Sequence, residues 1–115
     1  MIKLIDKTVD GVVVCAIEGK LSGIEGKGKV QKMIKEYLDK DIVKVILDLS
    51  KVSWIDSTGL GELIASLSSI KKMGGTLVLS NIQLPVQSLL RMTNLTQIFD
   101  TFETVENALA KLSSQ

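Results

Sequence analysis

Three consecutive polar residues, Asp56, Ser57 and Thr58, are the strongest candidates for chemistry in this sequence. They follow the apolar run 44–49 and precede a stretch with helical periodicity, so they stand at the start of a helix. Side chains of these types can accept hydrogen bonds from the unpaired N–H groups of a first helical turn. One cap needs only one side chain, and the others are therefore available for a second role.

Two glycines, Gly59 and Gly61, lie in the first turns of the same helix. A glycine within a helix costs about 1 kcal/mol relative to alanine, so both positions need a reason. Close approach of a partner and close packing of the helix on its own sheet are equally good explanations. Trp54, the only tryptophan, precedes the site, and either core packing or an anchoring role at an interface would account for it.

The residue types that are missing exclude several classes of enzyme. The chain of 115 residues has no histidine, which excludes Ser-His-Asp and Cys-His mechanisms and imidazole metal sites. Cys15 is the only cysteine, and we expect it to be a small buried side chain in a strand. No nucleophile has an evident general base beside it in the sequence. We therefore expect no catalytic residue, no metal site and no cofactor.

The charge of the chain is nearly balanced, with 14 basic and 13 acidic residues. With few aromatic residues available for stacking on bases, this balance argues against a nucleic-acid partner. Lysines concentrate between residues 20 and 44; a solvated helix face explains them, and a polyanion-binding patch is the alternative. No segment has the pattern of a signal peptide or a membrane span. We expect a cytoplasmic protein that binds no membrane.

The rest of the sequence predicts the elements that position this site. Segments 1–9 and 12–18 are rich in Ile, Val and Leu, and Asp10-Gly11 between them suits the tight turn of a β-hairpin. Segment 19–28 contains four glycines and is expected to be a flexible loop; its partial match to a phosphate-binding loop fails at Val30. Further predicted elements are a helix at 27–39, a strand at 44–49 and a helix at 59–73.

The last third of the chain continues the alternation of strands and helices. We predict a strand at 76–80, a short helix beginning near Pro85, a brief strand at Ile98-Phe99 and a final helix capped by Thr104. The whole pattern predicts one α/β domain over residues 1–115. Its single mixed β-sheet has about four to five strands, begins with the N-terminal hairpin and is faced by about four helices.

The run Asp-Ser-Thr-Gly-Leu-Gly at 56–61, after Val-Ile-Leu-Asp-Leu-Ser at 45–50, resembles the signature of STAS domains. The resemblance is specifically to bacterial anti-sigma factor antagonists, and it spans nearly the whole chain. Further matching segments are 18–21, 74–77 and 85–90, together with Ile98-Phe99 and Ala108.

This resemblance implies that Ser57 is phosphorylated by an anti-sigma factor that is also a serine kinase, with Thr58 as the alternative acceptor. The unmodified antagonist would bind that kinase and release the sigma factor. The phosphorylated form would not bind until a PP2C-type phosphatase removed the phosphate. The residues implied at the partner-binding surface are Asp56, Ser57, Thr58, Gly59, Gly61, Trp54 and Ser22.

A phosphate on Ser57 would add about −1.5 to −2 charge. A helix N-terminus stabilises an anion, so we expect phosphorylation to leave the fold intact and to act at the interface. The chain departs from the family at Ser22, where antagonists often carry an aspartate, and this affects which partner is bound. The alternative function is a non-switched STAS scaffold or ligand-sensing module. We expect a monomer or a weak dimer.

Overall fold

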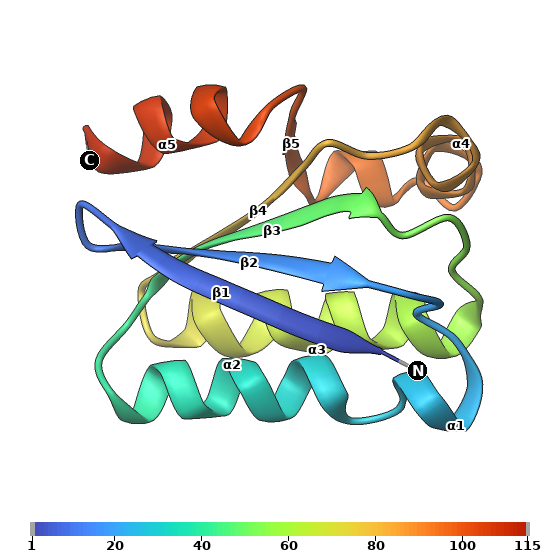
Figure 1. Ribbon diagram of the computed structural model, residues 1–115, viewed down its shortest axis with the longest axis horizontal. Coiled ribbons are helices and arrows are strands. Elements are labelled where there is room, and N and C mark those ends of the chain that lie inside the picture. The colour runs from blue at the N-terminus through green and yellow to red at the C-terminus, as the bar shows by residue number, and fades with distance from the viewer. Residues whose placement is uncertain (1, 115) are drawn as a thin grey trace.

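The computed structural model describes residues 2–114 and contains a five-stranded mixed sheet with the strand order β1-β2-β3-β4-β5 (Figure 1). The strands are β1 (Lys3–Val9), β2 (Val12–Glu18), β3 (Lys44–Lys51), β4 (Thr76–Ser80) and β5 (Asp100–Phe102). The β1–β2 pair is antiparallel, and the later pairs are parallel. The predicted fold class, an N-terminal hairpin followed by strand–helix units, is confirmed.

Within residues 2–114, four helices have nine residues or more. They are α2 (Lys29–Asp39), α3 (Ser57–Lys72), α4 (Leu84–Met92) and α5 (Val105–Ser113). Pro85 lies in the first turn of α4, where its missing N–H costs no helical hydrogen bond. Thr104 caps α5 as predicted, since its side chain accepts a hydrogen bond from the N–H of Asn107 at 3.0 Å. In this described part of the chain, no helix is long and apolar enough to cross a membrane.

Two segments differ from the prediction. The predicted strand at Ile98-Phe99 is wrong: a 3-10 turn, η1 (Leu95–Gln97), precedes this pair, and the strand that follows is β5. Phe99 is buried because its side chain joins the main core, whereas Ile98 is 45% exposed. The glycine-rich segment 19–28, predicted as a loop, contains the short helix α1 (Gly23–Gly26).

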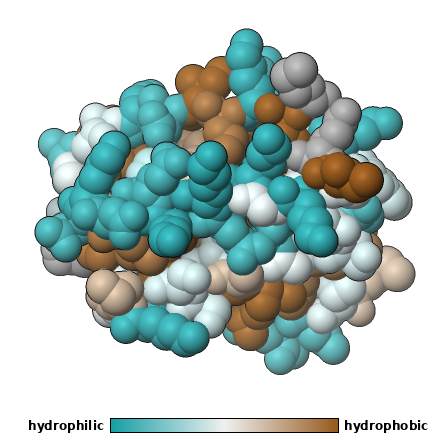
Figure 2. Space-filling view, turned by 90° about the horizontal axis from the view of Figure 1, so that it is seen from below, coloured by the Kyte–Doolittle hydropathy of each residue, from teal (hydrophilic) through white to brown (hydrophobic). Residues whose placement is uncertain are grey.

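The sheet separates two apolar cores. The larger core lies between the sheet and the helices α2 and α3, which run side by side across one face (Figure 1). Cys15 is fully buried in it, as predicted. The smaller core lies under α5 on the opposite face. Viewed from the side of α2 and α3, the surface is mostly hydrophilic with separate apolar patches (Figure 2), which agrees with a solvated face on the lysine-rich helix.

Candidate functional site

The polar run at 56–58 begins α3, and Asp56 is its cap. Oδ1 of Asp56 accepts a hydrogen bond from the N–H of Gly59 at 3.0 Å. Its other oxygen, Oδ2, accepts one from the N–H of Gly23 at the start of α1, also at 3.0 Å. These hydrogen bonds, mainly the one from Gly59, hold the pKa of Asp56 below its ordinary value. Asp56 therefore fixes the first turn of α3 and ties α1 to it.

Ser57 is the first residue of α3, and its side chain is exposed. Because Asp56 supplies the cap, the hydroxyl of Ser57 is not needed for that purpose. Within residues 2–114 this hydroxyl makes no hydrogen bond. Thr58 follows it in the first turn and is half-buried. Of the two hydroxyls, that of Ser57 is the more accessible to another macromolecule.

The structure distinguishes the two glycines of α3. Gly59 is buried, and a Cβ there would overlap the carbonyl oxygen of Leu21 and lie 2.7 Å from Cγ2 of Ile55. At Gly61, which is exposed, a Cβ would meet no atom within 4 Å. Leu21 and Ile55 are themselves paired by an isolated parallel β-bridge. Gly59 is thus required for packing, whereas Gly61 leaves open space on the outer side of the helix.

Ser22 also lies at this end of the molecule. It is the residue before α1, it is half-buried, and its side chain makes no capping hydrogen bond. The next residue, Gly23, has a positive φ of 57° and donates its N–H to Asp56. The structure therefore brings Ser22 close to the start of α3 through its chain neighbour, as the family resemblance implies.

Three large apolar side chains are exposed around the site: Trp54 is 55% exposed, Ile24 on α1 is 93% exposed, and Leu84 on α4 is 76% exposed. The start of α4 is held beside the end of β3 by a hydrogen bond of 2.7 Å from Nε2 of Gln83 to the carbonyl oxygen of Ser50. Figure 1 shows α1, the first turn of α3 and α4 at the same end of the sheet. We call Ile24, Trp54 and Leu84 the apolar rim. The exposure of Trp54 excludes the core-packing interpretation.

One important polar residue was not predicted from the sequence. Glu62 on α3 is 3% exposed, and its carboxylate accepts hydrogen bonds from the backbone N–H groups of Val30 at 3.2 Å and Gln31 at 3.3 Å. It also accepts one from the side-chain amide of Gln31. Helix α2 has no side-chain cap of its own at Gly28, so Glu62 caps it from the neighbouring helix. Local sequence patterns gave no signal for this role, because Val30 and Gln31 lie 32 and 31 positions away from Glu62 along the chain.

In the part of the chain that the structure describes, no group of three or more His, Cys, Asp or Glu side chains could hold a metal ion. Burial raises the pKa of the Cys15 thiol to about 11, so it stays protonated at neutral pH. The site is therefore an accessible hydroxyl on a capped helix, at the end of the molecule that also carries the apolar rim (Figure 1).

Comparison with known proteins agrees with this fold. The family model for the STAS domain matches residues 3–108, and the chain belongs to the STAS domain family. It is 34% identical over 107 residues to a candidate anti-sigma factor antagonist of Thermotoga maritima, with 92% of this chain and 94% of that protein covered.

Two solved structures show the same fold. The NMR structure of the protein TM1081 matches with a TM-score of 0.84 at 32% identity, covering 96% of this chain and 88% of that chain. The phosphorylated form of the Bacillus cell fate determinant SpoIIAA matches with a TM-score of 0.72 at 17% identity, covering 97% of this chain and 99% of that chain. The family resemblance predicted from the sequence is confirmed.

Proposed function

We propose that the protein is an anti-sigma factor antagonist whose unmodified form binds an anti-sigma factor serine kinase and thereby releases a sigma factor. The relationship to the Thermotoga protein supports this class. The observation that carries the proposal is the exposed hydroxyl of Ser57, which has no role in capping the 16-residue helix that it begins. This hydroxyl is the phosphoacceptor.

Phosphorylation moves the γ-phosphoryl group of ATP to Oγ of Ser57, ADP leaves, and the hydroxyl proton is released to solvent. The neutral hydroxyl becomes a group with about −1.5 to −2 charge. The dipole of α3 stabilises this anion, whereas the adjacent carboxylate of Asp56 repels it. The two effects oppose each other on an exposed surface, so the fold is retained and the switch does not act by unfolding.

The phosphate inhibits by destabilising the complex of the protein with the kinase. The apolar rim buries its exposed side chains against the kinase, and Gly61 lets the partner backbone approach α3. A phosphate at Ser57 would lose hydration in this interface without gaining a compensating partner. A penalty of about 1.4 kcal/mol already weakens binding tenfold. A PP2C-type phosphatase restores the hydroxyl and with it the binding.

In this role the protein is a binding partner and a substrate of the kinase, and it is not an enzyme. Its action takes place in the cytoplasm, where the sigma factor binds RNA polymerase. Ser22, Asp56 and Thr58 contribute to the same surface, with Asp56 acting mainly through the first turn that it fixes.

The test is incubation of the protein with an anti-sigma factor kinase and ATP, followed by intact-mass spectrometry. We expect one phosphate on the wild type and on Thr58→Ala, and none on Ser57→Ala. Calorimetry with the kinase should show binding by Ser57→Ala and at least tenfold weaker binding by Ser57→Asp. Equal labelling of Ser57→Ala and wild type would overturn the assignment, and no labelling of any variant would favour a non-switched scaffold.

A further inference from the structure

The two faces of the sheet are covered unequally. Helices α2 and α3 cover one face, whereas α5 covers the other and packs mainly against β2, β3, β4 and β5. The hairpin strand β1 lies outside this cover. Ile5, on the α5 side of β1, is 47% exposed. Apolar surface therefore remains open on the sheet beside α5.

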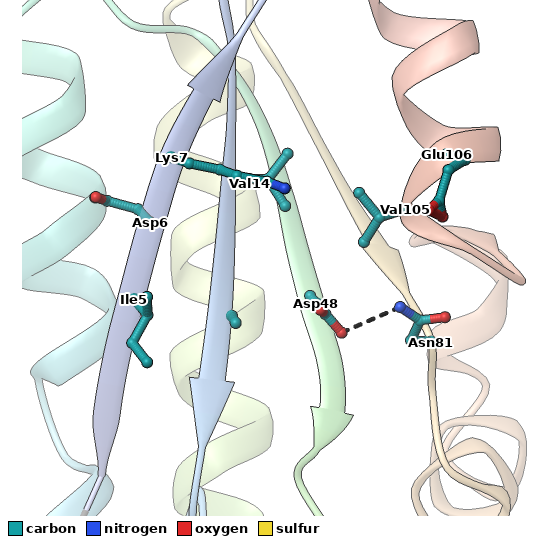
Figure 3. A pocket seen from close by; sticks show the side chains of 9 residues that line it. Ile5, Asp6, Lys7, Val14, Asp48, Asn81, Val105 and Glu106 are labelled. Carbon is teal, nitrogen blue, oxygen red and sulfur yellow. Dashed lines mark hydrogen bonds between the residues drawn. The ribbon is translucent and has the colours of Figure 1, made fainter.

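A trough of about 400 Å³ lies over this uncovered surface, between β1 and α5 (Figure 3). Its apolar lining comes from Ile5, Val14, Ala16 and Val105. Figure 3 shows the side chain of Asp6 turned away from the trough, and its Oδ2 accepts a hydrogen bond of 2.5 Å from the hydroxyl of Tyr37 on α2. Strand β1 is thus fixed from the opposite face, while the trough stays open.

The trough holds charged groups of both signs. Lys7 starts on β1 and its side chain extends across β2 to Val14, whereas Asp48 and Glu106 lie toward α5 (Figure 3). Oδ1 of Asp48 accepts hydrogen bonds from the N–H of Ser50 at 3.0 Å and from Nδ2 of Asn81 at 3.3 Å, which fixes the carboxylate. Its Oδ2 makes no hydrogen bond within residues 2–114. One fixed acceptor is therefore available to a donor from outside.

We infer that this trough binds an amphipathic helix of another protein, with its apolar stripe on the floor of the trough. Basic side chains on one flank of that helix pair with Asp48 and Glu106, and an acidic side chain on the other flank pairs with Lys7. This arrangement matches the separation of charge across the trough.

The geometry favours a helix over other occupants. Strands β1, β2 and β3, at about 4.8 Å spacing, span about 10 Å, which is the diameter of a helix. The hydrogen bonds of a sheet lie in its own plane, so an element on its face must satisfy its backbone internally, as a helix does. The trough is open along β1 and would bury less of a small molecule than an enclosed pocket does. The docked helix completes the second layer over the hairpin.

The probe for this inference is a synthetic peptide of about four helical turns. It has a leucine stripe, lysines along one flank and glutamates along the other. A control peptide of the same composition has lysines and glutamates alternating on both flanks, because a peptide with the flanks merely exchanged could dock with its chain direction reversed. In NMR titrations of the whole chain we expect amide shifts at Val14, Ala16 and Val105, and at least tenfold tighter binding of the first peptide than of the control peptide.

Charge reversal in the protein gives the decisive control. Lys7 is exposed, so the variant Lys7→Glu should fold, and because both sides of the trough are then acidic it should remove the preference for the first peptide. Ile5→Ser should weaken both peptides at least tenfold. Ser57→Asp should bind them as the wild type does, because α3 packs on the opposite face, and this separates the inference from the kinase-binding proposal.

Four outcomes would overturn the inference. The first three are equal binding of the two peptides, shifts confined to residues outside the trough, and no binding at all. A fourth is a response to a small amine such as n-hexylamine with no response to either peptide, which would make the trough a small-ligand site.

Discussion

The inner and outer sides of the first turns of α3 carry residues of opposite kinds. On the inner side, Gly59 packs under the carbonyl group of Leu21, and Glu62 caps α2. On the outer side, Ser57 and Gly61 are exposed, and their positions have open space around them. Helical rotation of about 100° per residue separates these two groups within one short motif. The residues that hold the helix are therefore distinct from those available for modification.

The largest expected effect on stability is that of Gly59→Ala, a substitution on the inner side of α3. Its Cβ would overlap backbone atoms of Leu21, which cannot move without disturbing the bridge to Ile55. We expect the free energy of unfolding to fall by about 3 kcal/mol, as in overpacked cores. Urea denaturation measures this change. A loss below about 0.5 kcal/mol, the usual range for surface substitutions, would contradict the close packing described above.

Glu62→Ala tests the second inner residue. It leaves the N–H groups of the buried Val30 and the exposed Gln31 without their acceptor. We expect a loss of about 2 kcal/mol, since a buried unsatisfied group carries its full desolvation cost. Urea denaturation measures the loss in the free energy of unfolding. Faster hydrogen exchange at the amide of Val30 would show that the loss arises at the start of α2. If exchange accelerates equally throughout the chain, the cap has no local role.

The carboxylate of Asp56 should give a dependence on pH that Asp56→Asn removes. Its folded-state pKa lies below its unfolded value, chiefly because of the Gly59 N–H bond. The stabilisation is therefore complete above the unfolded pKa of about 4 and is lost as pH falls through the lower folded value. Asparagine is also a good cap, so the variant isolates the charge. Denaturation midpoints of the two proteins should differ at pH 7 and converge in acid; a constant difference would contradict this assignment.

Gly61→Ala should have the smallest effect on stability and is the matched control for Gly59→Ala. Its new methyl group meets no atom, and alanine favours a helix, so we expect a gain of about 0.5 kcal/mol. Binding to the kinase should weaken, because the open space on the outer side is reduced. Thermal melts measure the stability of the variant, and calorimetry measures its affinity for the kinase. A loss of stability in Gly61→Ala would contradict the difference described between Gly59 and Gly61.

Local sequence patterns predicted the elements well because their causes are local. Asp10 and Gly11 both have positive φ, at 51° and 79°, as the predicted hairpin turn requires. The caps at Asp56 and Thr104 likewise depend on neighbours within one turn. Ile98-Phe99 was misassigned because an apolar pair indicates burial and does not by itself indicate a strand.

The tertiary part of the site could not be predicted from local patterns. Helix α1 is held by the bond from Gly23 to Asp56, which joins residues 33 positions apart. The bond from Val30 to Glu62 spans 32 positions. A glycine-rich segment and an isolated glutamate have many possible partners in a chain, and only the packing of α1 and α2 on α3 selects these. The different roles of Gly59 and Gly61 could likewise be distinguished only from the position of Leu21.

Trp54 gives the chain a built-in optical reporter. It is the only tryptophan in the sequence, and its indole is 55% exposed at the end of the molecule proposed to dock. Indole emission shifts to shorter wavelengths when the ring leaves water. Fluorescence from this one ring should therefore follow complex formation, and its reversal by phosphate, without a dye or an added label.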